Sequence, residues 1–376
     1  MFETREEFAE RVMKNLRHKA GADLRYDVTT DSIIGPAPRL DLLPFYDVVS
    51  NFSETTLEVD LAVWDAWCAW SAQEKVPKRF EDAKSYIYPR INLRAHFKIG
   101  TLADSPIRPH QVVGEHLGAG LIIYVAPHFV HVTQEQLDGW DISFADALSQ
   151  AIKNLADDQT FLRRGPLWRS AGAGKCNNAS LLLTDRIGEL DDLKGEPIAG
   201  APTLSTLFIT GSEDEEGLAA LQRCVSEPYN SHYLSGFALK LHNGVWEDWM
   251  PERTAPLFSK FYEERLQSLA RTYRLASEAF EARGQSPQVG VFQHLHPGSE
   301  IYSYTVWKKG RPELLPRTDA VTFINEDVVD RVTEGDWEHV QRVVGHLMQR
   351  QPGYPELYFV KEFPSPQEIE RIRLRT

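Results

Sequence analysis

Apolar residues recur at the spacing of an amphipathic helix in several stretches of this chain. Near the N-terminus, Thr4 and Glu7 have the spacing of a capping box, and an apolar stripe follows them. Ser143 precedes a similar stripe, and a long one runs through Leu257–Arg283. Further helices are predicted at Asp41–Phe52, Asp60–Ser71, Leu181–Leu190, Asp214–Val225 and Asp336–Gln349.

Shorter runs rich in β-branched and aromatic residues predict strands. The clearest hairpin joins Phe237–Leu241 to Val245–Trp249, because the Asn-Gly pair between them tolerates positive φ. Leu121–Val132 predicts a second hairpin, in which Pro127 fits only a turn or a sheet edge. The other predicted strands are Leu24–Val28, Ser32–Ile34, Ile87–Leu93, Thr206–Gly211, Val289–Leu295, Ile301–Lys308, Ala320–Asn325 and Leu357–Phe363.

One ordered series of these elements carries a family resemblance. The strand, turn, strand and capped helix of Leu121–Leu155, with the segment Tyr86–Ile91, resemble the YtpQ-like family of bacterial proteins, whose function is unknown. The resemblance covers roughly residues 1–250, including Asp185–Ile187 and Leu207–Gly217. It implies mixed sheets with flanking helices and supplies no chemistry.

The helical and strand patterns together predict an α+β protein. Residues 1–250 would form the YtpQ-like region, with a break near 156–180, since Gly165–Asn178 has the composition of a Gly-rich polar loop. Pro251 and Pro256 lie where the predicted strands give way to a long helical stripe. After them we expect a connecting helix over 251–284 and a small α+β domain over 285–376.

Composition narrows the classes of partner. The net charge of −13 disfavours general binding to nucleic acids or anionic membranes, because such a surface repels phosphates. No apolar run approaches the ~18 residues of a membrane span, and the charged N-terminus is unlike a signal peptide. The three cysteines show no CxxC spacing, so we expect reduced thiols and a cytoplasmic protein.

The sharpest chemical pattern is His294-Leu-His296, followed by Glu300. Two histidines at i and i+2 on a strand share a face, and the three residues resemble the first metal-binding motif of cupins. By that resemblance all three would ligate a divalent metal. The pattern lacks an expected glycine at position 288, which is Gln288, and a later strand with another histidine. A turn leading into the next strand is the alternative.

Two further groups suggest binding surfaces. Trp64, Trp67 and Trp70 recur every three residues, which suits either a partner surface or a core face. A basic set in and beside the Gly-rich loop suits either an anion site or a solvated loop: Arg163, Arg164, Arg169 and Lys175.

Taken together, these patterns predict a non-catalytic binding or regulatory protein of the cytoplasm, without a cofactor and with another protein as its partner. An accessory role in bacterial stress response or in conflict and defence would suit such a protein. The alternative is a metal-dependent enzyme that uses His294, His296 and Glu300.

Overall fold

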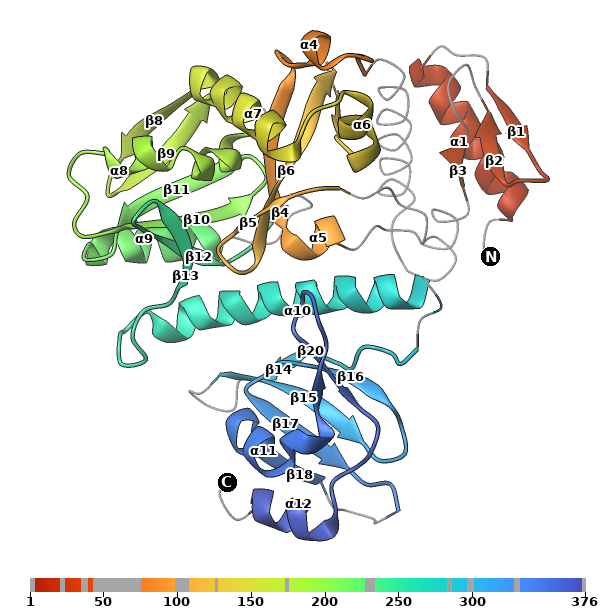
Figure 1. Ribbon diagram of the computed structural model, residues 1–376, viewed down its shortest axis with the longest axis vertical. Coiled ribbons are helices and arrows are strands. Elements are labelled where there is room, and N and C mark those ends of the chain that lie inside the picture. The colour runs from red at the N-terminus through yellow and green to blue at the C-terminus, as the bar shows by residue number, and fades with distance from the viewer. Residues whose placement is uncertain are drawn as a thin grey trace. The chain divides into compact units, whose positions relative to one another are not determined.

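The computed structural model describes most of the chain, which folds into helices and mixed sheets (Figure 1). This confirms the predicted α+β class. The helices are α1 Arg5–Ala20, α4 Phe80–Ala83, α5 Arg94–Lys98, α6 Gln134–Gly139, α7 Phe144–Asp158, α8 Thr184–Gly188, α9 Glu215–Val225, α10 Phe258–Ala282, α11 Trp337–Val344 and α12 Pro366–Arg373, with 3-10 turns η1 Asn177–Leu182 and η2 Gly345–Leu347. The described residues are 4–20, 24–34, 40–42, 76–98, 108–125, 128–172, 176–226, 234–282, 284, 286–295, 301–327 and 332–373.

The chain divides into two compact units. The first takes its residues from 1–87, 122–132 and 139–141, and the second comprises 88–121, 133–138 and 142–376. The boundaries of these units differ from those of the predicted regions 1–250, 251–284 and 285–376. Those regions stay a prediction about independently folding parts. Among the described residues, no helix has both the length and the apolar character to cross a bilayer.

In the first unit, α1 begins at the predicted capping box. Thr4 N donates to Glu7 Oε2 over 2.8 Å, and Glu7 N donates to Thr4 Oγ1 over 3.2 Å. A small antiparallel sheet follows, ordered β1-β2-β3. Its strands are β1 Arg25–Asp27, β2 Ser32–Ile34 and β3 Leu40–Asp41.

The predicted helix at Asp41–Phe52 is wrong at its start. Asp41 lies in β3 and pairs with Ser32, because the backbone groups of β2 offer it a ladder. Beyond Leu42 this range lies outside the described residues, as does the whole of Asp60–Ser71.

The predicted hairpin at Leu121–Val132 is present. The end of β6 (Leu117–Val125) pairs antiparallel with β7 (His128–His131). The other end of β6 pairs with β5 (Gln111–Val113) in the second unit, and β4 (Ile87–Leu93), predicted with the same limits, completes the order β4-β6-β5. Helix α7 then starts where predicted, since the Ser143 hydroxyl accepts from Asp146 N.

The largest sheet lies in the second unit and has six antiparallel strands in the order β13-β12-β10-β11-β9-β8. One core cluster at this sheet includes Ile198 and Leu221, and so joins β10 to α9. Asn243 and Gly244 have φ values of 49° and 78°, which confirms the predicted hairpin turn. The strands are β8 Gln159–Arg164, β9 Leu167–Gly172, β10 Pro197–Thr203, β11 Thr206–Gly211, β12 Ala238–His242 and β13 Val245–Trp249.

Two sequence predictions fail beside this sheet. The predicted loop Gly165–Asn178 contains β9, because pairing with both β8 and β11 fixes a segment whose own residues carry little strand signal. The predicted helix Leu181–Leu190 breaks at Leu183, between η1 and α8. Leu181 and Leu183 are both buried, and one straight helix would point them to different sides.

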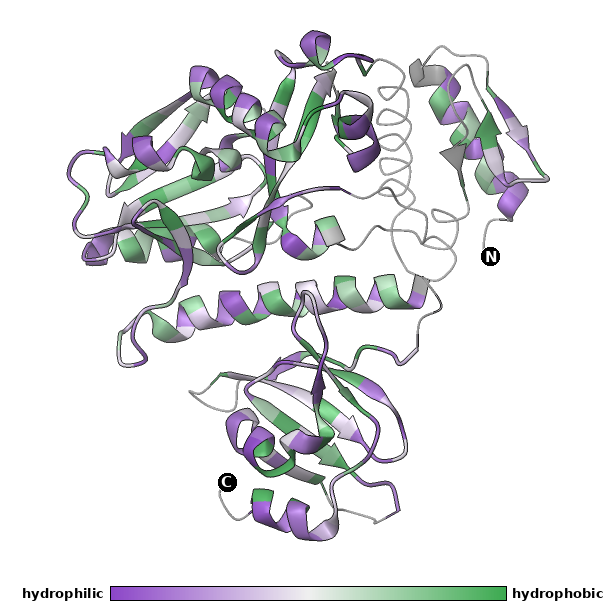
Figure 2. Ribbon diagram, viewed as in Figure 1, coloured by the Kyte–Doolittle hydropathy of each residue, from purple (hydrophilic) through white to green (hydrophobic). Residues whose placement is uncertain are grey.

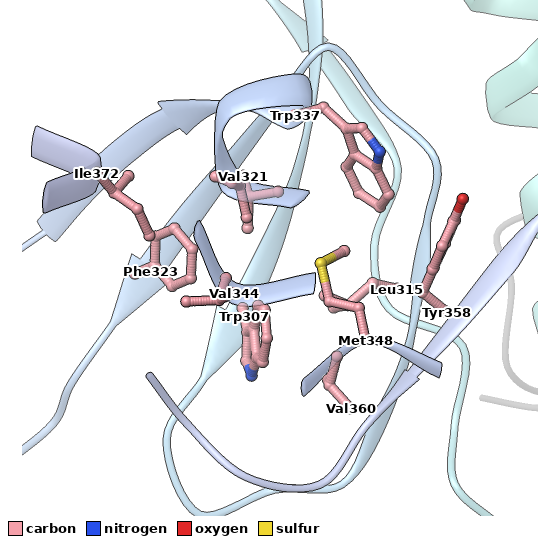
Figure 3. Close-up of a cluster of buried hydrophobic side chains, with 11 residues drawn as sticks. Trp307, Leu315, Val321, Phe323, Trp337, Val344, Met348, Tyr358, Val360 and Ile372 are labelled. Atoms are coloured by element: carbon pink, nitrogen blue, oxygen red, sulfur yellow. The ribbon is translucent and has the colours of Figure 1, made fainter. Parts of the chain in front are cut away.

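The C-terminal part of the second unit follows α10. Its core lies where α11 meets the strands and gathers Trp307, Phe323 and Trp337 (Figure 3). Figure 2 shows apolar residues concentrated on the strands and along parts of α10. A four-stranded sheet runs β14-β15-β17-β18, with only β15 and β17 parallel among its described pairs, and a second sheet runs β16-β20-β19. The strands are β14 Gln293–Leu295, β15 Tyr302–Lys308, β16 Glu313–Pro316, β17 Ala320–Ile324, β18 Val332–Asp336, β19 Gln349–Arg350 and β20 Leu357–Val360.

Candidate functional site

The predicted metal motif is only partly within the described residues. His294 is half-buried on β14, where it pairs with Ser303 of β15. His296 and Glu300 lie outside the described residues, so a metal site formed by the three stays a prediction. Two later histidines lie in helical turns, His339 in α11 and His346 in η2, as their sequence context predicts. Trp64, Trp67 and Trp70 also lie outside the described residues.

The predicted anion loop is mostly a hairpin. Its arginines lie on β8 and β9, and side chains alternate between the two faces of such strands. Arg163 therefore faces away from Arg164 and forms an exposed ion pair with Asp192 at 2.6 Å. Arg169 lies over the Phe208 ring at 5.8 Å. The three arginines do not converge on one point, and Lys175 lies outside the described residues.

A charged network that the sequence did not reveal surrounds Asp248, near the end of β13. Its Oδ1 accepts from Glu115 N over 2.9 Å. Its Oδ2 accepts from Arg265 Nη1 over 2.9 Å and lies 3.1 Å from His116 Nε2. Glu115 and His116 lie in the tight turn between β5 and β6, and Arg265 lies on α10. We call Glu115, His116, Asp248 and Arg265, with Tyr354, the Asp248 network.

The imidazole of His116 is fully engaged in this network. Its Nδ1 lies 3.0 Å from the Tyr354 hydroxyl, and its ring stacks on Phe237 at 4.3 Å between centroids. Its Nε2 lies within reach of both Asp248 Oδ2 and Arg265 Nη2. If Nε2 carries a proton, it donates to the Asp248 carboxylate. If Nε2 is deprotonated, it accepts a hydrogen bond from the Arg265 guanidinium. In either case both ring nitrogens are used within the protein.

Electrostatics and burial hold Asp248 and Tyr354 in fixed protonation states. Burial would raise the pKa of Asp248, but the hydrogen bond and charge of His116, together with Arg265 and the Glu115 N–H, outweigh it and hold that pKa well below its usual range. Burial raises the pKa of Tyr354 far above its ordinary value. The carboxylate is thus ionised and saturated near pH 7, and the phenol is neutral.

Glu115, His116 and Asp248 offer donor atoms within 4.8 Å of one another, which is the spacing of a cation site. The guanidinium of Arg265 already contacts two of these groups, through Nη1 to Asp248 and through Nη2 to His116. A divalent ion would have to sit against that fixed positive charge, which Coulomb repulsion opposes. The donor set is therefore occupied by an arginine and does not fit a metal.

A second group of charges gathers around α5. We call it the basic cluster, and it consists of Arg90 from β4, His96 from α5, Arg108 from the segment before β5, and Arg271 from α10. The helix links these segments, since Phe97 stacks on His110 at 5.0 Å, two residues after Arg108, and α5 packs against α10. Figure 1 shows α5 beside both β5 and α10.

The arginines of the basic cluster act on the imidazole of His96. Burial lowers the pKa of His96, and the charges of Arg108, Arg90 and Arg271 lower it further, to about 4. The described charged groups that shift this pKa are all arginines. Burial also lowers the pKa of Arg108 and of Arg90, the latter partly offset by the thiol of Cys176, which hydrogen-bonds its guanidinium. His96 is therefore neutral near pH 7, among cations.

The chain matches no family model, no curated protein and no solved structure. Membership of the YtpQ-like family stays a prediction. What the protein can do must therefore be argued from its side chains.

The two groups of side chains offer different chemistry. In the Asp248 network both oxygens of Asp248 accept hydrogen bonds, and the Tyr354 phenol keeps its proton. The basic cluster offers hydrogen-bond donors and positive charge, which are the groups that hold a carboxylate or a phosphate.

Proposed function

We propose that the protein is a non-catalytic binding protein, and that the basic cluster receives an anionic group of its ligand. Two observations support this: arginines from β4, the segment before β5 and α10 all lower the pKa of the half-buried His96, and α5, which carries His96, packs against α10. The arginines do so within a chain of net charge −13.

The physical reason for an anion is the repulsion between like charges. Burial of Arg90 and partial burial of Arg108 weaken the hydration of both guanidinium groups, which makes the approach of cationic groups more costly than it is in water. A carboxylate or phosphate placed between them would offset that cost and accept paired hydrogen bonds from the guanidinium forks. Either anion satisfies the same chemistry.

The low pKa of His96 supports a non-catalytic role. An imidazole with a pKa of about 4 is a weak base at pH 7, far from the value that general acid–base catalysis favours. We propose another protein as the source of the anion, as the sequence predicts. The cytoplasmic location and a role in bacterial stress response or defence are part of the same proposal.

Titration with inorganic phosphate and, separately, with succinate tests this function. We expect one of the two anions to bind at low salt, measured by calorimetry on the full chain. Arg108→Gln and Arg271→Gln should each weaken binding about tenfold, the effect of losing roughly 1.4 kcal/mol of charged hydrogen bonding. Arg163→Gln, which removes an exposed arginine on β8, is the matched control and should bind as the wild type does.

The pH dependence gives an independent readout. A bound anion favours protonated His96, so its pKa should rise above about 4 in the complex, as seen by NMR. By linkage, binding of phosphate, which stays a monoanion over this range, should then tighten as the pH is lowered from about 6 toward 4. Failure of both anions to bind, or equal affinity in the wild type and Arg108→Gln, would contradict the proposal.

A further inference from the structure

A cleft of about 610 Å³ lies in the second unit, between the start of α10 and the strands β15, β17 and β18. Its volume is within the range of small-ligand pockets, ~300–1,000 Å³. It is built from residues that belong neither to the Asp248 network nor to the basic cluster. Its lining therefore indicates a separate ligand.

Aromatic rings form one side of the cleft. Phe258 and Tyr262 follow each other by one turn of α10 and stack with 5.4 Å between centroids and 15° between planes. Tyr302 joins them from β15. Flat aromatic faces attract cations, and a planar guanidinium can lie parallel to them.

Carboxylates supply the charge. Asp319 is held in place by the Tyr262 hydroxyl and by Ser303, whose N and Oγ donate over 2.7 and 2.6 Å. Glu334 of β18 hydrogen-bonds Tyr302. With Asp336, three acidic residues and one basic residue, Arg253, line the cleft, so its formal charge is −2.

We propose that this cleft binds an arginine side chain of a partner polypeptide. The guanidinium would lie on the open face of the stacked Phe258–Tyr262 pair and donate to Glu334 and to the remaining acceptor site of Asp319. The volume exceeds what one side chain fills, which leaves room for the adjoining peptide backbone. Arg253 also lines the cleft, and its positive charge opposes the entry of a second cation.

Three capped tripeptides serve as probes: Gly-Arg-Gly, Gly-Lys-Gly and Gly-citrulline-Gly. Calorimetry on the full chain should show that the arginine peptide binds at least five times more tightly than the lysine peptide. Citrulline keeps the shape and loses the charge, so its peptide should not bind. Equal binding of the three peptides, or tighter binding of free spermidine, would overturn the assignment.

Variants locate the site. Glu334→Gln should weaken binding of the arginine peptide at least fivefold. Glu326→Gln, which removes the same charge from an exposed residue just after β17, should leave it unchanged. Arg253→Gln should tighten binding, because it removes the opposing positive charge. Unchanged binding in both Glu334→Gln and Arg253→Gln would place the peptide elsewhere and sink the proposal. The outcome is independent of the phosphate and succinate titrations.

Discussion

Gly114 lies in the turn between β5 and β6 with a φ of +60°, a conformation that L-residues adopt only at a cost. A Cβ at this position would lie 2.7 Å from Leu239 Cδ2 and 2.8 Å from Asp248 Oδ1. The next residue, Glu115, donates its N–H to the same carboxylate oxygen. The glycine thus lets the turn approach Asp248 closely enough to form the network.

Replacing this glycine tests the close approach. Gly114→Ala should lower the free energy of unfolding by about 2 kcal/mol or more, because the strained backbone costs about 1–2 kcal/mol and the methyl group also displaces Leu239 or Asp248. Gly165→Ala is the control, since Gly165 has a φ of +59° and no atom within 4 Å of an added Cβ. Urea denaturation measures both. Equal losses in the two variants would show that the contacts around Gly114 have no energetic role.

At the scale of elements, the Asp248 network joins four separate segments. Asp248 comes from β13, His116 from the turn before β6, Arg265 from α10, and Tyr354 from the loop before β20. The backbone hydrogen bonds of β13 and α10 do not depend on these side chains. The network therefore fixes how the elements meet, which explains why so many charges are placed where water is scarce.

Asp248→Asn should lower the free energy of unfolding by about 3 kcal/mol, the lower end for a broken buried ion pair, because Arg265 remains partly exposed. The uncharged amide would leave Arg265 and His116 without their shared carboxylate. Asp192→Asn breaks an exposed ion pair with Arg163 and should have little effect on urea denaturation. A loss in Asp248→Asn as small as that of Asp192→Asn would mean that the network is incidental.

At the scale of the whole molecule, the basic cluster ties stability to pH. The pKa of His96 is about 4 in the folded protein and 6.5 for the free side chain. As the pH falls below 6.5, His96 takes up a proton in the unfolded chain, whereas in the folded chain it stays neutral until about pH 4. Protonation therefore favours unfolding, and by pH 4 this one group should have removed about 3 kcal/mol of stability.

His96→Asn tests this coupling, because asparagine does not titrate. Urea unfolding at pH 7.5 and at pH 4.5 should show a smaller loss of stability in the variant than in the wild type, by about 2–3 kcal/mol. Identical losses in the two proteins would contradict the low pKa of His96. A saturating anion in the cluster should reduce the wild-type loss, since it raises the same pKa.

Several elements could be predicted because their signals are local. The capping box at Thr4 and Glu7 and the Asn243–Gly244 turn each depend on residues within a few positions of one another. The strand Ile87–Leu93 is apolar enough to be found from its own composition. By contrast β9, with its small and polar residues, is a strand because β8 and β11 pair with it.

The candidate sites could not be predicted, because nothing in the local sequence marks their members. His116 and Tyr354 are separated by 238 positions, yet their side chains lie 3.0 Å apart. The arginines of the basic cluster are likewise single residues on different elements. The motif at His294 and His296 can be found without a structure because it is compact in sequence, and it stays a prediction.

The sequence by itself determined where most helices and strands form, and the α+β class that follows from them. Those properties come from hydrogen bonds and apolar spacing within a few residues. Only the tertiary structure decided which charges meet, because burial and pairing depend on how distant segments pack. Nothing in the sequence distinguishes Arg265 or Arg271 from an ordinary surface arginine. Each becomes part of a site only because α10 brings it to its neighbours.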